Sequence, residues 1–192
     1  RDTEEQFIHQ LRALVDEKLA GTEFYREAND SFEESLRRLL FLKSVIEGQD
    51  GYRMFYFKGK PIQREADLQI LYRLTWCAST YDVNREVNNG RGPVDFKVSK
   101  GSKDKTLIEF KLASNSKLKH QVGVYEAAND TAKSIKAILY FSESEFRKVQ
   151  GTLNELGLNG RRDVVLIDAC RDNKPSASNV RDSAQGVLDL DS

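Results

Sequence analysis

Asp95, Glu109 and Lys111 are the residues of this chain whose types and spacing best suit chemistry. They lie in residues 92–96 (Gly-Pro-Val-Asp-Phe) and 108–112 (Ile-Glu-Phe-Lys-Leu). Two carboxylates and an amine on neighbouring strands are what metal-assisted phosphodiester cleavage requires, because the carboxylates hold the cation and the amine acts beside the reacting water.

The two segments have the spacing of a β-hairpin. Residues 101–103 (Gly-Ser-Lys) lie midway between Asp95 and Glu109, so a symmetric hairpin places these two carboxylates opposite each other. Because side chains alternate between the faces of a strand, one face is chemical and the other is apolar, packed on the core. The chemical face would carry Asp95, Lys97, Glu109 and Lys111, and the core face Phe96, Val98, Ile108, Phe110 and Leu112.

Two carboxylates placed opposite each other repel, and a cation between them would remove that repulsion. Mg²⁺ suits the pattern because it takes a few carboxylates together with waters and phosphate oxygens, and Mn²⁺ is an alternative. The competing interpretation is a solvated strand face of mixed charge, which is common for an isolated Glu-x-Lys. The Gly-Pro before Asp95, the hairpin register and the apolar reverse face favour the metal site.

Composition sets looser limits. The 192 residues include 30 basic and 30 acidic residues and are 39% apolar, which is typical of a soluble globular protein. There is no signal peptide and no apolar run near the roughly 18 residues of a membrane span, so we expect a cytoplasmic protein without a membrane partner. Cys77 and Cys170 are expected to be reduced and buried, and His9 and His120 have no neighbours that would complete a zinc site.

The charges are unevenly distributed along the chain. Residues 1–50 hold seven basic and twelve acidic residues, whereas residues 97–119 hold seven lysines and two acidic residues. This basic stretch around the candidate site predicts a polyanion partner, with Lys97, Lys117 and Lys119 as substrate-binding residues. Lys103 and Lys105 could instead belong to a hairpin tip whose charge prevents aggregation.

The elements divide the chain into three parts. Residues 1–50 are expected to form an N-terminal helical hairpin that serves packing or oligomerisation, with apolar stripes over residues 3–19 and from Phe32 through Leu36, Leu39, Leu40 and Ile46 to Gly48. Residues 51–170 form the candidate nuclease domain, and residues 171–192 a flexible tail.

The expected strands are 52–57, 82–87, the two hairpin strands, 135–141 and 164–167. The expected helices are 62–79, 116–129 with Ser116 as N-cap, and one running from a capping box at Ser142 to Gly157.

The motifs together resemble those of the PD-(D/E)xK nucleases, the restriction-endonuclease-like superfamily, over roughly residues 60–170. In that family a helix carries a glutamate, a strand an aspartate, the next strand (D/E)-x-K, and a following helix often a glutamine. Glu65, Asp95, Glu109-x-Lys111 and Gln121 match these positions in order. Gln121-x-x-x-Tyr125 is similar to the Q-x-x-x-Y of the recombination-repair exonuclease branch. Val94 between Pro93 and Asp95 is a departure from the core motif.

The resemblance implies a restriction-endonuclease-like core, in which a central mixed β-sheet is flanked by helices. It implies that Asp95, Glu109 and the Phe110 carbonyl bind Mg²⁺, that Glu65 holds a second metal or a metal-bound water, and that Lys111 acts on the water and the phosphate. Gln121 would fix the site or the phosphate, and Tyr125 would contact the substrate backbone. For Glu65 a helix-start role, for Gln121 a buried hydrogen bond, and for Tyr125 core packing remain open.

The function expected from these features is Mg²⁺-dependent phosphodiester hydrolysis. A DNA endonuclease in restriction, phage defence or repair is favoured. The same chemistry on RNA or on DNA ends, and a domain that binds nucleic acid without cleaving it, are the alternatives. A homodimer is expected as one assembly, and an upstream domain or a partner as another, since the chain begins at Arg1 rather than Met.

Overall fold

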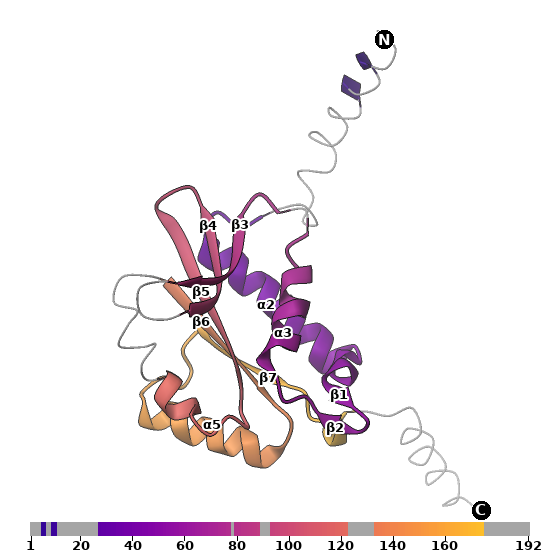
Figure 1. Cartoon of the computed structure of the whole chain (residues 1–192), viewed down its shortest axis with the longest axis vertical. Helices are drawn as coiled ribbons and strands as arrows, with labels where there is room; N and C mark the ends of the chain where they lie inside the picture. Colours follow the sequence, from indigo (N-terminus) through magenta and orange to yellow (C-terminus); the bar gives the residue numbers. More distant parts are fainter. Residues whose placement is uncertain are drawn as a thin grey trace, which may run out of the picture.

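A computed structural model of the chain describes residues 5–6, 9–10, 27–77, 79–88, 93–122 and 133–174 (Figure 1). Most of the expected helix 3–19, the turn at 89–90, Tyr125 and the tail from residue 175 lie outside these ranges. The helices are α2 (Ser31–Gly48), α3 (Glu65–Leu74) and α5 (Glu143–Glu155), with short 3-10 helices η2 (Gly51–Phe55) and η3 (Arg171–Asn173). The strands are β1 (Tyr56–Phe57), β2 (Lys60–Pro61), β3 (Asp82–Asn88), β4 (Pro93–Lys100), β5 (Asp104–Leu112), β6 (Lys133–Tyr140) and β7 (Val164–Asp168).

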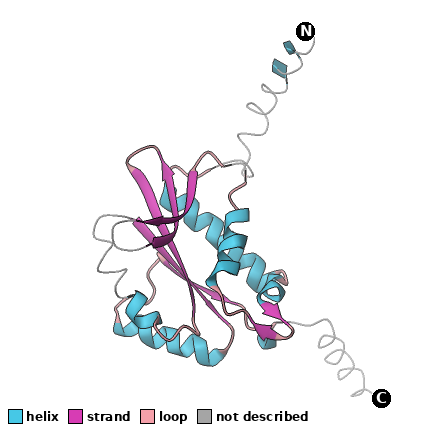
Figure 2. Ribbon diagram, viewed as in Figure 1, coloured by secondary structure: helices cyan, strands magenta, loops and turns pink. Residues whose placement is uncertain are grey.

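The centre of the fold is a five-stranded sheet in the order β3-β4-β5-β6-β7. The β3–β4 and β4–β5 pairs are antiparallel, whereas the β5–β6 and β6–β7 pairs are parallel. The parallel pairs require crossover connections, which explains why α5 lies between β6 and β7 in the chain. Helices cover both faces (Figure 2), with α2 and α3 on one face and α5 on the other. The expected mixed sheet flanked by helices is confirmed.

The register of the β4–β5 hairpin is the one predicted from the sequence. The ladder joins Phe96 to Ile108 and ends at the pair of Lys100 with Asp104. Gly101 begins the turn with a φ of +70°, a left-handed conformation that glycine adopts without strain. The predicted core face is confirmed as well, since all five of its apolar residues are buried in the main cluster.

The opposite face of β5 is covered too, which corrects the expectation of a strand pair packed on one side only. Glu109 is 4% exposed and Lys111 is 7% exposed. Lys111 is the register partner of Ile138, which belongs to a second apolar cluster that also contains Leu118, Val149 and Leu153. Glu109 and Lys111 are therefore buried and do not lie on an open strand face.

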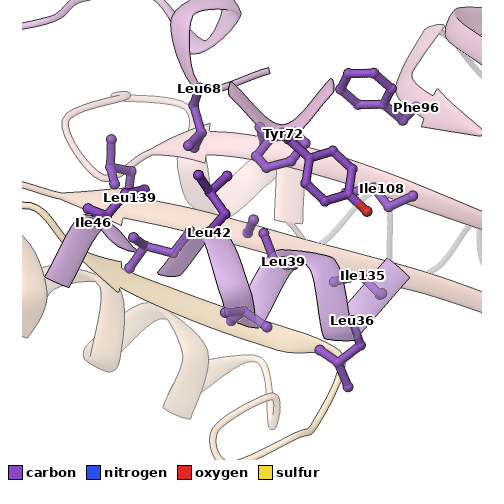
Figure 3. Close-up of a cluster of buried hydrophobic side chains, with 14 of the residues drawn as sticks. Leu36, Leu39, Leu42, Ile46, Leu68, Tyr72, Phe96, Ile108, Ile135 and Leu139 are labelled. Atoms are coloured by element: carbon purple, nitrogen blue, oxygen red, sulfur yellow. The ribbon is translucent and has the colours of Figure 1, made fainter. Parts of the chain in front are cut away.

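The main core joins α2 to the sheet (Figure 3). Leu36, Leu39, Leu42 and Ile46 of α2 are buried against strand residues such as Ile135. The expected boundary near residue 51 thus does not separate this helix from the sheet. Leu40, expected in the apolar stripe, is 46% exposed, because one residue step turns a helix by about 100° away from Leu39.

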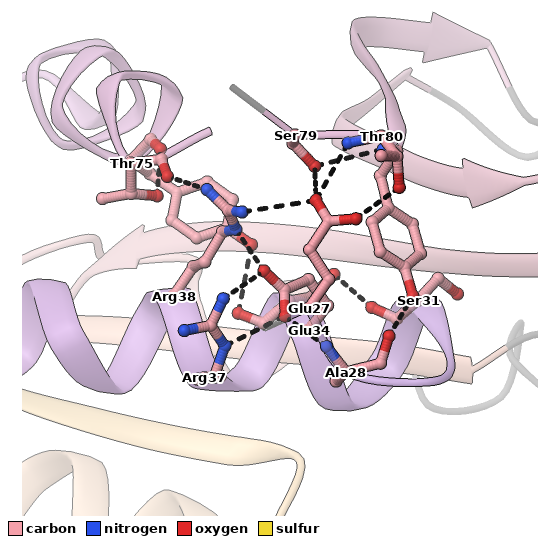
Figure 4. Close-up of polar contacts among 12 residues, drawn as sticks. Glu27, Ala28, Ser31, Glu34, Arg37, Arg38, Thr75, Ser79 and Thr80 are labelled. Atoms are coloured by element: carbon pink, nitrogen blue, oxygen red, sulfur yellow. Dashed lines mark hydrogen bonds and ion pairs between the residues drawn. The ribbon is translucent and has the colours of Figure 1, made fainter. Parts of the chain in front are cut away.

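A polar network fixes the start of α2 (Figure 4). The carboxylate of Glu34 is fully buried and accepts hydrogen bonds from Arg37, Arg38 and the Ala28 N–H. Arg38 also donates to the Thr75 carbonyl, just after α3. Because a buried carboxylate is stable only when its charge is paired, this network ties α2 to the end of α3.

Three local predictions require correction. The aromatic residues 52–57 do not form one strand, because Tyr52 and Phe55 are buried three residues apart in the 3-10 helix η2, and only the last two residues form β1. The helix expected over residues 62–79 is the shorter α3, since the N–H groups of the three residues after Leu74 bond to carbonyls three residues back, in tight turns. Cys77 is exposed, whereas Cys170 is buried as expected and both are free thiols.

Other local predictions are confirmed. Ser142 caps α5 by accepting a hydrogen bond from the Glu145 N–H, and Gly157 follows the helix with a φ of +67°. Tyr72 and Trp76 pack in the core. Among the residues described, no helix is both long enough and apolar enough to cross a membrane.

The packing of α2 on the sheet predicts different effects for two adjacent leucines. Leu39→Ala should lower the free energy of unfolding by about 2–5 kcal/mol, because it leaves a cavity under the sheet. Leu40→Ala at the exposed neighbouring position should change it by about 0.5 kcal/mol or less. Urea denaturation measures both, and equal losses would contradict the placement of α2.

Candidate active site

The candidate site lies where β4 and β5 separate. Their ladder ends at the pair of Phe96 with Ile108, but β5 continues to Leu112. Beyond the ladder, the backbone N–H of Phe110 donates to Asp95 Oδ2 at 2.6 Å, and that of Leu112 donates to Glu65 Oε1 at 3.3 Å. Two carboxylates thus take the place of strand carbonyls along this part of β5, as buried N–H groups require acceptors.

Asp95 and Glu65 reach this gap from different elements. Asp95 lies on β4, 30 residues after Glu65 in the sequence, and the fold brings both carboxylates to β5. Glu65 is the first residue of α3, where a carboxylate is also stabilised by the helix dipole. Their side chains are 17% and 25% exposed, so the gap remains open to solvent on this side.

Lys111 lies at the centre of the site. Its Nζ atom is 3.4 Å from Glu65, 3.4 Å from Glu109 and 4.0 Å from Asp95. One ammonium group thus faces three carboxyl groups, and the guanidinium of Arg85 also acts electrostatically on Asp95. The three predicted acidic residues and the predicted lysine are therefore brought together by the fold.

Burial and the closeness of the carboxyl groups affect their protonation. Burial and the neighbouring charge of Asp95 raise the pKa of Glu109 to about 7, although Lys111 acts in the opposite direction. Burial also raises the pKa of Asp95, against the influence of Lys111 and the Phe110 N–H. A pKa near neutrality is typical of residues at functional sites, although buried structural networks produce it too.

The donor set fits a hard divalent cation. Glu109 Oε1 is buried without a hydrogen-bond partner; Trp76 Nε1 in the core is the other such side-chain atom among the described residues. Within those residues, no three His, Cys, Asp or Glu side chains are arranged to hold a metal by themselves. Mg²⁺ does not need such a set, because it takes one or two carboxylates and completes its shell with waters and phosphate oxygens. The Phe110 carbonyl, the further expected ligand, accepts a hydrogen bond from Lys111 at 3.0 Å.

Gln121 joins the site through a residue that the sequence analysis missed. Asn115 Nδ2 lies 3.2 Å from Gln121 Oε1 and 3.4 Å from Glu65 Oε1. Asn115 also accepts the Lys117 N–H with its side chain, which is the N-capping role expected of Ser116, at the start of the helical residues 118–122. Gln121 thus contacts the site through Asn115.

The predicted substrate-binding residues are more scattered. Lys97 is half-buried two residues after Asp95 on β4, and Lys117 is exposed beside Asn115. Lys119 is exposed and pairs with Glu155 of α5, so the structure does not direct it toward the carboxylates. Tyr125 lies outside the described residues.

Gln69 and Arg85 are two further contributors that the sequence did not indicate. Gln69, one turn after Glu65 on α3, donates from Nε2 to Asp95 Oδ1 at 2.8 Å, and Arg85 of β3 donates to Gln69 Oε1 at 3.1 Å. The spacing of Glu65 and Gln69 places both on one face of a helix, which is the signal that could have identified Gln69.

A separate hollow between α2, η2 and α3 does not suit this chemistry. It has a volume of about 220 Å³ and is lined mainly by apolar residues, among them Phe41, Met54 and Leu74. None of the candidate site residues lines it. Its apolar walls offer nothing to a phosphodiester, so we place the candidate site at the carboxylates and not in this hollow.

Comparison with known proteins identifies the class of domain to which these elements belong. Residues 31–143, from the first residue of α2 to the first residue of α5, match the family described as a domain of unknown function, DUF8371. The chain belongs to this family, and Glu65, Asp95, Glu109, Lys111 and Gln121 all lie within the matched residues. No curated protein matches the chain.

The raised pKa of Glu109 predicts a pH dependence of stability. Between pH 4.5, the usual pKa of a glutamate, and about pH 7, the Glu109 carboxyl group binds its proton more tightly in the folded protein than in the unfolded chain. The resulting stabilisation is complete below pH 4.5 and is lost as the pH rises through about 7. Glu109→Gln keeps the shape but cannot ionise, so its stability should fall less than that of the wild type over this range, by roughly 1–3 kcal/mol.

Urea denaturation in EDTA across about pH 5 to 8 measures this difference. Glu143→Gln, at an exposed carboxyl group in the first turn of α5, serves as the control and should follow the wild type. Parallel curves for the wild type and Glu109→Gln would contradict the raised pKa.

Proposed function

We propose that the protein is a Mg²⁺-dependent nuclease with a restriction-endonuclease-like core that hydrolyses phosphodiester bonds, with Mn²⁺ as an alternative cation. The observation that carries the proposal is the arrangement of Glu65, Asp95 and Glu109 around Lys111 at a solvent-accessible gap in the sheet. The order helix glutamate, strand aspartate, Glu-x-Lys and helix glutamine, from which the resemblance was drawn, supports it independently.

The charge balance of the cluster favours a ligand over a purely structural role. A structural network of buried charges is most stable when each charge is paired, as for Glu34 with its two arginines. Around Lys111 three carboxyl groups share one ammonium group, and among the described residues Glu109 Oε1 has no hydrogen-bond partner. A divalent cation would correct both features at once.

Each residue then has a defined task. Asp95 and Glu109 would hold the cation, which when bound supplies Lewis acidity and a more acidic water. Lys111 orients the water and contacts the scissile phosphate, since its ammonium lies between the carboxylates. Glu65 holds a water or a second cation at the solvent-exposed side, and Gln121, through Asn115, keeps Glu65 in place.

The substrate is nucleic acid, with DNA favoured over RNA. Lys97, two residues after Asp95, and Lys117, beside Asn115, would bind phosphates next to the site, and Lys119 would join them by leaving Glu155. We propose an endonuclease of restriction, phage defence or repair in the cytoplasm. It would act as a homodimer or together with another domain or partner that supplies specificity.

Cleavage of supercoiled DNA in Mg²⁺ tests the proposal. Lys111→Met keeps the buried aliphatic stem but removes the ammonium, so it should reduce the cleavage rate at least about 100-fold while Mg²⁺-free DNA binding persists. Asp95→Asn should have a similar effect. Lys105→Ala, at an exposed lysine on the same strand, should reduce the rate less than about threefold.

Linear DNA and RNA are assayed beside supercoiled DNA to identify the substrate class. Cleavage of RNA or of DNA ends alone would favour the second candidate. Binding that weakens steeply with salt, without cleavage of any substrate, would favour a non-cleaving nucleic-acid-binding domain. Equal cleavage by the wild type and Lys111→Met would refute the catalytic role of Lys111.

A further inference from the structure

Gln69, on α3, is a buried polar neighbour of Asp95. It is 7% exposed, and its Nε2 atom donates to Asp95 Oδ1 at 2.8 Å. The other oxygen of Asp95 accepts the Phe110 N–H at 2.6 Å. Two donors from different elements, one on α3 and one on β5, therefore fix both the position and the plane of this carboxylate.

Arg85 determines which end of the Gln69 amide faces Asp95. Its guanidinium donates to Gln69 Oε1 at 3.1 Å. An arginine can only donate, so the oxygen of the amide must point to Arg85 and the NH₂ group to Asp95. The hydrogen bonds thus run in one direction: Arg85 on β3 donates to Gln69 on α3, and Gln69 donates to Asp95 on β4.

The two carboxylates of the proposed metal site are held differently. Each oxygen of Asp95 accepts one hydrogen bond and retains a second lone pair, whereas Oε1 of Glu109 accepts none from the part of the chain that the structure describes. Asp95 is therefore the pre-oriented carboxylate, and Glu109 is the one with an unused oxygen. Partners of this kind, which hold a ligating side chain from behind, commonly change metal affinity or activity by about 10–100-fold when they are removed.

We propose that Gln69 is a positioning residue that holds the Asp95 carboxylate in the orientation in which it binds a divalent cation, with Arg85 fixing the Gln69 amide. This inference rests on the proposed function, because it assigns Asp95 as a ligand. It adds a residue outside the motif positions that the sequence indicated.

Isothermal titration of the full chain with Mg²⁺ tests the role directly, without relying on cleavage. Gln69→Met keeps the length of the side chain but removes its hydrogen bonds, so the dissociation constant for Mg²⁺ should rise about tenfold or more. Arg85→Met leaves the amide in place and should cause a smaller rise. Gln63→Met, at an exposed glutamine before α3 whose side chain donates to the Pro61 carbonyl, should match the wild type.

Plasmid cleavage over a range of Mg²⁺ concentrations and thermal unfolding in EDTA complete the test. If Gln69→Met unfolds in EDTA, Arg85→Met carries the measurement. A lower unfolding temperature with an unchanged Mg²⁺ dissociation constant would indicate a merely structural role and overturn the inference. Absence of Mg²⁺ binding by the wild type would overturn it as well.

The outcomes for the inference and for the proposed function can be separated. Weaker Mg²⁺ binding by the variants, together with wild-type cleavage at a raised Mg²⁺ requirement for Gln69→Met, supports both. Weaker Mg²⁺ binding by the variants without cleavage by the wild type supports the role of Gln69 and rejects the nuclease. Cleavage by the wild type with equal Mg²⁺ binding by all variants supports the nuclease and rejects the role of Gln69.

Discussion

The backbone of β5 beyond Ile108 sets the main constraint on this structure. β5 runs on to Leu112, but its pairing with β4 ends at Ile108. The N–H groups of Phe110 and Leu112 therefore need other acceptors. Asp95 and Glu65 supply them. Both carboxylates are thereby drawn to one strand, and the burial of Lys111 between them follows, because carboxylates in a part-buried gap require a positive neighbour.

The placement of α3 depends on the same gap. Its first residue, Glu65, and Gln69 one turn later both bind β-sheet groups, while Leu68 and Tyr72 on the adjacent stripe are buried in the main core. The helix is thus held by apolar packing along one stripe and by polar contacts along the next. This arrangement allows an amphipathic helix to contribute to the core and to the candidate site at once.

The elements and the residues of the candidate site could be predicted from the sequence to different extents. The hairpin register followed from the alternation of apolar residues and from Gly101, because a strand pair with one buried face tolerates no slip by one residue. The burial of Glu109 and Lys111 did not follow, because it depends on tertiary packing on the reverse face of β5, where Lys111 is the register partner of Ile138 in the second apolar cluster. Gln69 and Asn115 were missed for a related reason, since their roles come from tertiary contacts and a lone amide has no sequence signature.

The buried charges around Lys111 are less completely paired than those at Glu34. The buried carboxylate of Glu34 is paired with two arginines, whereas at Lys111 three carboxyl groups share one ammonium group and Glu109 Oε1 has no hydrogen-bond partner among the described residues. Departures of this kind from good packing and pairing are expected where a site is built for something that binds to it. A bound divalent cation, as the proposed function requires, would supply both a positive charge and a partner for this oxygen.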